Sequence, residues 1–222
     1  MDGFFNITAK VFFIFLFIST IYILIRNRVS LKKAAESSKD AIFPSTTEEY
    51  SRILIPNEWK EMIPLSKDTK SYKYVHWGTI IATIFLTALI GILIFTDFID
   101  SSSFFNIAYV FFLVLLTVKH RGNLFILPQG LILNGKYYTI HQIKHYEVEQ
   151  IVRWHTLYGL DSRVDNGYKL TISLKSPFAN PLVVVVEDYT HLEKIVKLLH
   201  EKGIAINPKS EQALGEKEKE QP

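Results

Sequence analysis

The chain has 222 residues, of which 48% are hydrophobic, and it carries a formal net charge of +3 and no cysteine. This length allows one or two ordinary domains, and the hydrophobic content with its positive mean hydropathy favours a membrane protein. The absence of cysteine excludes a disulfide framework, a thiolate nucleophile and a cysteine-based zinc site. Much of the small basic excess lies beside the apolar runs, where membrane topology explains it, so it indicates no nucleic-acid partner.

Three apolar runs in the first part of the chain predict transmembrane helices. The first covers residues 4–25 with Lys10 as its only charge, and the second covers 75–96 with no charged residue. About 20 helical residues cross a hydrocarbon core, so both runs are long enough to span it. The third, 103–119, contains only about fifteen strongly apolar residues, and whether it spans completely is open. The short connection 97–102 favours a helical hairpin, which gives three spans.

Basic residues lie close to only one end of each of these apolar runs. Lys and Arg in short loops concentrate on the cytoplasmic side of a membrane, and here they follow the first run, precede the second and follow the third. The 97–102 connection contains two aspartates and no basic residue, which fits the outside. We therefore predict a multi-pass protein of the cell membrane with its N-terminus outside and its C-terminal domain in the cytoplasm. The membrane-flanking basic residues are Arg26, Arg28, Lys32, Lys33, Lys70, Lys73, Lys119 and Arg121.

The polar segment 26–74 is predicted to be a cytoplasmic linker. Thr46 and Glu49 match a capping box, which predicts a short helix that ends before Pro56. A second short helix is predicted over 58–63. Two interpretations of the apolar side chains in this segment are open: they lie in the membrane interface, or they pack against the cytoplasmic domain or the ends of the transmembrane helices. These side chains are Tyr50, Ile53, Leu54, Trp59 and Met62.

The segment 120–206 is predicted to be one small domain of antiparallel strands closed by a helix. Asn134-Gly135 and Asn166-Gly167 each predict a two-residue hairpin, because a type I′ turn requires positive φ at both central positions. Residues 154–158 are either a further strand or the end of the preceding one, which gives six or seven strands. The other strands are expected over 124–127, 131–133, 136–140, 143–151, 168–174 and 182–186.

A C-terminal amphipathic helix is predicted to complete this domain. Thr190 and Glu193 match a capping box, and Gly203 is expected to end the helix. Apolar residues at i, i+3, i+4 and i+7 predict one face that packs on the sheet. The charged segment 207–222 is predicted to be a disordered tail. The apolar face consists of Leu192, Ile195, Val196 and Leu199.

Short antiparallel strands closed by one C-terminal helix resemble the pleckstrin-homology-like (PH-like) barrel. The residues of 130–138 together with 143–147 are similar to the membrane-tethered PH-like domains of Firmicutes, and the resemblance covers residues 120–205 and the arrangement of the anchor. It implies a fold class of three transmembrane helices followed by a small antiparallel β barrel, in a family mostly without assigned function. By the same resemblance, the class includes an immunity protein against the bacteriocin sublancin.

No residue pattern predicts a catalytic centre, a metal site or a cofactor. His141 and His145 are four residues apart in a pattern of strand and turn, and along a strand this spacing is about 13 Å, too far to bind one metal ion. Carboxylates such as Glu147 and Glu149 have no converging partner. The chain contains no Walker loop, nucleophile elbow or dinucleotide fingerprint. We therefore predict that the protein is not an enzyme.

Scattered basic residues of the C-terminal domain are the candidate contacts for membrane lipid or a protein partner. An anionic leaflet attracts such residues, whereas the interleaved acidic residues fit an ordinary solvated face, and both interpretations are open. Two interpretations of the aromatic residues near Arg153 are open: they form an exposed contact patch, or they pack in the core. The candidate headgroup or partner contacts are Lys136, Lys144, Arg153, Trp154 and Tyr158.

The favoured function is a membrane-tethered binding or regulatory module at the inner leaflet. The alternative is an immunity or stress-protection protein that intercepts a membrane-active peptide. A transporter or channel is disfavoured, because three spans without an intramembrane carboxylate or arginine provide no ion or proton path. The sequence determines neither the ligand nor the oligomeric state.

Overall fold

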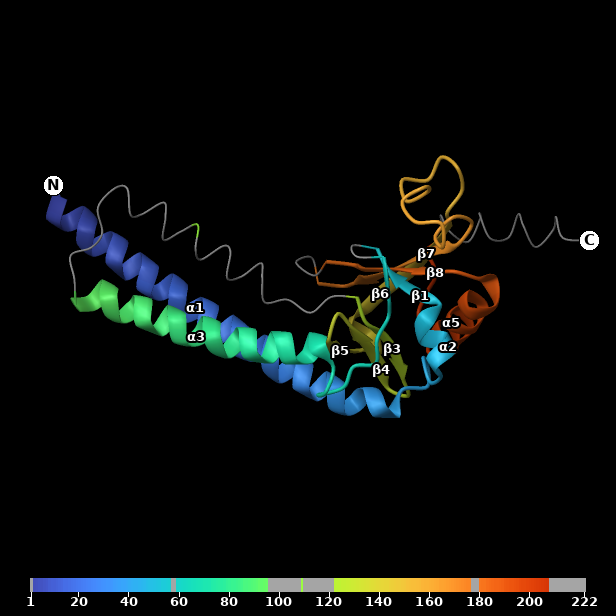
Figure 1. Ribbon diagram of the computed structural model, residues 1–222, viewed down its shortest axis with the longest axis horizontal. Coiled ribbons are helices and arrows are strands. Elements are labelled where there is room, and N and C mark those ends of the chain that lie inside the picture. The colour runs from blue at the N-terminus through green and yellow to red at the C-terminus, as the bar shows by residue number, and fades with distance from the viewer. Residues whose placement is uncertain (1, 57–58, 96–108, 110–121, 177–179, 208–222) are drawn as a thin grey trace, which may run out of the picture. The chain divides into compact units, whose positions relative to one another are not determined.

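The computed structural model describes residues 2–56, 59–95, 109, 122–176 and 180–207. The chain forms two compact units, one of residues 1–32 and 66–120 and the other of residues 33–65 and 121–222. We call these the helical unit and the β unit. Figure 1 shows the elements of both.

Two helices form the described part of the helical unit. Helix α1 runs over Asp2–Ser37, its last residues belonging to the β unit, and α3 runs over Lys70–Phe95. Both extend beyond the apolar runs that predicted them, because the flanking polar residues include no proline and continue the helical pattern. Both are long and apolar enough to cross a membrane. The predicted loop 97–102 and, apart from Tyr109, the predicted third helix 103–119 lie outside the described residues.

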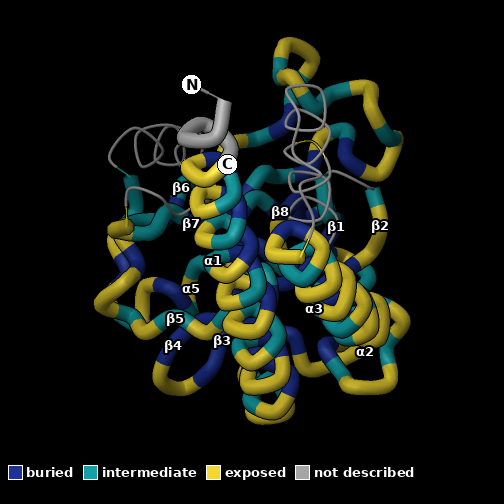
Figure 2. The backbone as a smooth tube through the Cα atoms, turned by 90° about the vertical axis from the view of Figure 1, so that its left-hand side faces the viewer, coloured by how far each residue is buried: buried dark blue, intermediate teal, exposed yellow. Residues whose placement is uncertain are grey.

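Within the helical unit α1 and α3 lie side by side and antiparallel, as both views show (Figures 1 and 2). Their buried residues alternate in steps of three and four along each helix, the spacing of a coiled-coil seam. Phe13 and Phe17 are fully buried on α1, and Leu86 is fully buried on α3. The seam also includes Ala9, Thr20 and Leu24 of α1, and Tyr72, Val75, Thr79, Ala82 and Leu93 of α3.

Large apolar side chains also cover the outward faces of both helices. Phe15 is 70% exposed on α1, and Ile81 and Ile84 are each 65% exposed on α3. The surfaces are therefore as apolar as the seam, which distinguishes these helices from amphipathic helices of soluble proteins. Other exposed apolar residues are Ile7, Val11, Phe12, Ile18, Ile25, Phe85, Ile92 and Ile94.

The second stretch of the β unit, residues 121–222, begins with a three-stranded antiparallel sheet. Its order is β3-β4-β5, with β3 at Leu124–Leu127, β4 at Gly130–Leu133 and β5 at Lys136–Thr139. Asn134 and Gly135 have φ angles of 51° and 71°, the positive values that a type I′ turn requires. This predicted hairpin is therefore confirmed. A short 3-10 helix, Ile140–Gln142, leads to the next strand.

The other sheet has five strands in the order β2-β1-β8-β7-β6, all paired antiparallel. Strands β6, β7 and β8 lie at Ile143–Gln150, Tyr168–Leu174 and Leu182–Val186, as predicted. Strands β1, Ile53–Ile55, and β2, Lys60–Glu61, come from the segment expected to be a linker. Across the described residues the two sheets form no closed barrel.

The predicted helices of the linker segment are partly wrong. The capping box of Thr46 and Glu49 is present and opens α2, but this helix covers only Thr47–Ser51. Ile53 and Leu54 instead pair with Val186 and Val185 of β8, because a β-branched, buried stretch gains more from an existing sheet edge than from a short helix. The helix predicted over 58–63 is replaced by β2. A 3-10 turn, Ser38–Asp40, precedes α2.

The predicted two-residue hairpin at Asn166-Gly167 is also wrong. Gln150 pairs directly with Tyr168, so the whole segment 151–167 connects β6 to β7. Asn166 has a φ of 69°, but Gly167 does not have positive φ. Residues 154–158 form turns and not a strand.

The closing helix α5 runs over Tyr189–Glu201. Its N-cap is Asp188 and not the predicted Thr190, since the Asp188 carboxylate accepts a 2.9 Å hydrogen bond from the His191 amide. Gly203, at φ 70°, ends the helix as predicted. The predicted apolar face is confirmed: Leu192, Ile195 and Leu199 are buried and Val196 is partly buried.

The main core of the β unit lies between the two sheets and α5. Residues of the segment 42–62 complete it, because Phe43, Ile53 and Met62 are at most 2% exposed and belong to the same cluster. Tyr50 packs against this cluster. Of the two interpretations for the apolar residues of this segment, packing against the domain is therefore confirmed for these side chains.

Candidate functional site

The candidate site is the segment 151–167, which we call the β6–β7 loop. Its two ends are fixed by Ile151 and Val164, which are both fully buried. They pack with Leu54 and Val185 in a second apolar cluster. Because side chains alternate across a strand, Leu54 and Val185 point to the face of the five-stranded sheet that lies opposite the main core. The loop therefore covers part of this second face.

Backbone hydrogen bonds close the base of the β6–β7 loop. The amide of Ile151 donates to the carbonyl of Gly167 at 2.8 Å, and the amide of Asn166 donates to the carbonyl of Ile151 at 3.1 Å. Further along, the Gly159 amide donates to the Asp165 carboxylate at 2.8 Å. These contacts give the loop a defined conformation although it contains no helix or strand.

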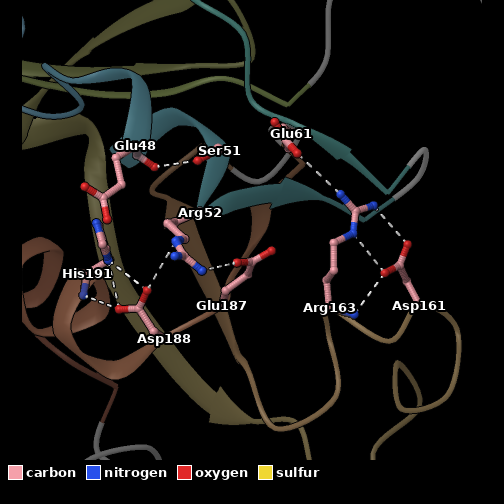
Figure 3. A network of polar contacts seen from close by, with 9 residues as sticks. All are labelled: Glu48, Ser51, Arg52, Glu61, Asp161, Arg163, Glu187, Asp188 and His191. Carbon is pink, nitrogen blue, oxygen red and sulfur yellow. Dashed lines mark hydrogen bonds and ion pairs between the residues drawn. The ribbon is translucent and has the colours of Figure 1, made fainter.

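Arg163 joins the β6–β7 loop to the turn between β1 and β2 (Figure 3). Its guanidinium donates to both carboxylate oxygens of Asp161, at 3.1 and 3.0 Å, and to the carbonyl of Trp59 at 2.6 Å. Glu61 lies 3.6 Å away. The hydrogen bonds from Arg163 hold the pKa of Asp161 below its ordinary value. Arg163 is exposed and Asp161 is partly exposed, so solvent screens the pair and it contributes orientation more than stability.

Three polar side chains form a second support at the base of the loop. Glu149 of β6 accepts a 2.8 Å hydrogen bond from Lys169 of β7 and lies 3.3 Å from His155 of the loop. The hydrogen bond from Lys169 is the main reason that the pKa of Glu149 lies below its ordinary value. His155 Nδ1 also accepts the amide of Leu157 at 3.0 Å, which orders the chain just after Trp154.

Trp154 projects from this ordered loop into solvent, with 87% of its surface exposed. Arg153 beside it is exposed and forms no ion pair within the described part of the chain. Leu160, 57% exposed, adds a second apolar side chain to the same loop. Of the two interpretations for Trp154, the exposed position is correct. Leu160 was not among the predicted contacts, because nothing in its sequence neighbourhood distinguishes an exposed leucine from a buried one.

The other candidate contacts do not join this surface. Tyr158 packs against the second apolar cluster and is half-buried. Lys144 lies at the far end of β6 from the loop, six residues or roughly 20 Å from Gln150. Lys136 belongs to β5, in the other sheet. Of the five candidates, only Arg153 and Trp154 lie next to each other on the exposed part of the loop.

A separate polar network joins α2, β8 and α5 (Figure 3). Arg52 donates to Glu187 at 2.9 Å and lies 4.0 Å from Asp188. Asp188 contacts Nδ1 of His191 at 2.8 Å. These contacts fasten the N-terminus of α5 to the end of β8 and to Arg52 at the end of α2.

The membrane-flanking residues divide into three groups. Arg26, Lys32, Lys70 and Lys73 are exposed in the helical unit, and Arg28 there is half-buried. Lys33 is exposed in the β unit. Lys119 and Arg121 lie outside the described residues.

No group of three or more potential metal-ligating side chains occurs in the described part of the chain. His145, one of the histidines considered for metal binding, lies 3.0 Å from a carboxylate oxygen of Glu147.

The chain matches no protein family, no curated protein and no solved structure. The candidate site is thus defined by geometry alone.

Proposed function

We propose that the protein is an integral membrane protein that presents a PH-like binding module to the cytoplasm at the inner leaflet. In this proposal the module binds a protein partner through the β6–β7 loop and performs no catalysis. The observation that carries the proposal is the exposure of Trp154 on a loop that buried residues and hydrogen bonds hold in place.

The membrane part of the proposal is supported by the outward faces of α1 and α3. An aqueous helix pair buries its apolar side chains in the seam and exposes polar ones. Here residues such as Phe15, Ile81 and Ile84 are at least 65% exposed. In lipid this arrangement is favourable, because the hydrocarbon solvates outward-facing apolar groups. The asymmetric basic flanks favour a cytoplasmic β unit.

A PH-like relationship is supported by the order of the elements in the β unit. Strands β3, β4 and β5 form one antiparallel meander, β6, β7 and β8 form a second, and α5 follows directly. In our proposal β1 and β2 are an addition that lengthens the second sheet at its β8 edge. The β6–β7 loop is then a surface connection between two strands of this scaffold, a common place for recognition residues.

The composition of the loop fits a protein partner better than a lipid surface. Trp and Arg are the residues most enriched among those that dominate binding energy at protein interfaces. The loop as a whole is not basic, since Asp161 and Asp165 balance Arg153 and Arg163. An anionic surface would attract such a loop weakly.

Site-specific photocrosslinking in intact cells tests this proposal. A photoreactive phenylalanine analogue placed at Trp154 is expected to give one discrete protein adduct. Lys197, on the exposed side of α5, is the matched control and is expected to give none. Identical adduct patterns from the two positions would refute a contact through the loop.

The identity of the adduct also separates the two functions. An endogenous protein captured at Trp154 supports a regulatory module. A membrane-active peptide captured from probes on the outward face of α1, such as Phe15, and not at Trp154, would support the immunity function instead. Carbonate extraction of membranes checks the anchor independently, and release of the protein by carbonate would refute membrane integration.

A further inference from the structure

Arg28 of α1 and His76 of α3 contact each other across the seam of the helical unit. Nε of Arg28 donates a hydrogen bond to Nδ1 of His76 at 3.2 Å, and Nη2 of Arg28 lies 3.3 Å from Nε2 of the same ring. A guanidinium has no acceptor, so Arg28 is the donor in this contact and Nδ1 of His76 is the acceptor. The half-buried pair retains the full positive charge of the guanidinium.

Aromatic neighbours hold the ring of His76 in place. Tyr72 is stacked with it, with ring centroids 6.0 Å apart and an interplanar angle of 21°. Trp77 meets it edge-on at 5.9 Å. Tyr72 is buried, whereas Trp77 is 59% exposed. A fixed imidazole fixes the direction of the Arg28 guanidinium as well.

Two lysines lie one helical turn from this pair on the same helix faces. Lys32 follows Arg28 by four residues on α1, and Lys73 precedes His76 by three residues on α3. Residues three or four apart share a helix face. Because the helices are antiparallel, both lysines lie on the same side of the Arg28–His76 contact. We call Arg28, Lys32, Lys73 and His76 the basic cluster.

Little negative charge opposes the basic cluster. The segments 26–32 and 66–76 together contain six cations and a single carboxylate, Asp68. Arg28, Lys32 and Lys73 form no ion pair with any residue that the structure describes. The free N–H groups of Arg28 are thus available to an external anion. The planar guanidinium can donate two parallel hydrogen bonds to the oxygens of a phosphate.

We propose that the basic cluster binds the phosphate of an anionic phospholipid between α1 and α3. Arg28 supplies oriented donors, and Lys32 and Lys73 supply ammonium groups on flexible stems. The exposed ring of Trp77 then lies at the lipid interface, where tryptophan is enriched. Basic sites between transmembrane helices generally bind such headgroups. This inference rests on the proposed membrane insertion of α1 and α3.

Quenching of Trp77 fluorescence by brominated lipid tests the proposal on the full chain. The protein has three tryptophans, so replacing Trp59 and Trp154 by phenylalanine leaves Trp77 as the only reporter. In nanodiscs of fixed composition, brominated phosphatidylglycerol is expected to quench it more than brominated phosphatidylcholine at the same mole fraction. The triple variant Arg28→Gln, Lys32→Gln and Lys73→Gln is expected to lose roughly fivefold or more of this preference.

A matched variant separates a specific site from general attraction. Arg26→Gln, Lys67→Gln and Lys70→Gln remove the same charge from the same end of the helical unit and leave the basic cluster intact. This variant is expected to keep most of the preference. An equal loss in the two triple variants would overturn the proposal, and so would equal quenching by the two lipids before any substitution.

Two further measurements make the outcome decisive. Arg28→Lys keeps the charge but loses the paired N–H donors of the guanidinium, so it is expected to weaken the preference for phosphatidylglycerol. Circular dichroism is expected to show unchanged helix content in this variant. Inorganic phosphate, compared with chloride at equal ionic strength, is expected to leave the quenching unchanged. Phosphate that abolishes the preference would instead assign the cluster to free phosphate. Absence of quenching by either lipid would refute membrane insertion itself, a result distinct from insertion without preference.

Discussion

The ammonium group of Lys194 in α5 donates a hydrogen bond to Oε1 of Glu49 in α2, across 145 residues of sequence. The other carboxylate oxygen of Glu49 accepts the amide of Ser45 at 2.6 Å and the amide of Thr46 at 3.3 Å. The same ammonium lies 5.7 Å from the centroid of the Phe43 ring. One buried carboxylate thus caps α2 and fastens the segment before it to the closing helix.

Replacing Lys194 by alanine is expected to lower the free energy of unfolding by about 1 kcal/mol. The variant leaves the carboxylate of Glu49, which is 7% exposed, without its cation. The effect is smaller than for a fully buried pair because half of the Lys194 side chain is in solvent. Denaturant unfolding of the full chain in detergent measures it. Lys197→Ala, on the exposed side of α5, is the control, and an equal loss there would contradict this role of Lys194.

Acidification is expected to weaken the same connection. Burial raises the pKa of Glu49, but the hydrogen bonds from Lys194, Ser45 and Thr46 outweigh it, so the pKa lies below the ordinary 4.5. The folded protein therefore binds this proton less readily than the unfolded chain. The resulting stabilisation is fully present above pH 4.5 and is lost as the pH falls through the folded pKa. Stability curves of the wild type and Glu49→Gln are expected to converge at acidic pH. Parallel curves would show that Glu49 does not contribute in this way.

The assignment of the segment 33–65 to the β unit predicts a large effect for Ile53→Ala. Ile53 is fully buried in the main core, and removing its side chain leaves a cavity that is expected to destabilise the protein by about 2–4 kcal/mol. Ile63→Ala in the same segment is the control, because Ile63 is 52% exposed. The measurement is the shift in the denaturation midpoint. Similar small shifts for both variants would mean that this segment is a linker after all.

Trp154→Ala is expected to separate stability from binding. An exposed side chain contributes little to folding, so the free energy of unfolding is expected to change by less than about 0.5 kcal/mol. With the photoreactive probe placed at Leu160, the yield of the partner adduct is expected to fall at least about tenfold. An unchanged yield in the variant would show that Trp154 is not part of the contact.

The position of the α5 cap gives a further prediction. Asp188→Ala removes the acceptor for the His191 amide and is expected to destabilise the protein by about 1 kcal/mol. Thr190→Ala, at the cap predicted from the sequence motif, is expected to change stability little. Thermal unfolding followed by circular dichroism compares the two variants. A larger effect of Thr190→Ala would show that Thr190, and not Asp188, is the N-cap of α5.

Local patterns predicted the elements whose residues act on their immediate neighbours. The Asn134-Gly135 turn, the capping box at Thr46 and the apolar face of α5 are set within a few residues of chain, and all three are confirmed. Asn166-Gly167 has the residue types of a two-residue hairpin turn but lies at the end of a long ordered connection. Whether such a pair turns two strands depends on which residues pair across it, and the strands meet at Gln150 and Tyr168.

Three features required the tertiary structure because distant residues create them. Ile53 and Leu54 become strand only because the edge of β8 offers Val186 and Val185 as partners. Trp154 is exposed because Ile151 and Val164 occupy the space beneath the loop. Arg28 was predicted only as a membrane-flanking residue, and the antiparallel packing of α1 and α3 brings it to His76.

The sequence by itself determined two membrane-length helices, the strands of 124–186 and a C-terminal amphipathic helix, since apolar periodicity and turn residues act locally. Only the tertiary structure decided that the segment 33–65 belongs to the β unit and that Trp154 is exposed. The physical reason is that burial is a property of the assembled fold. Whether an aromatic or basic side chain faces solvent depends on what distant segments place against it.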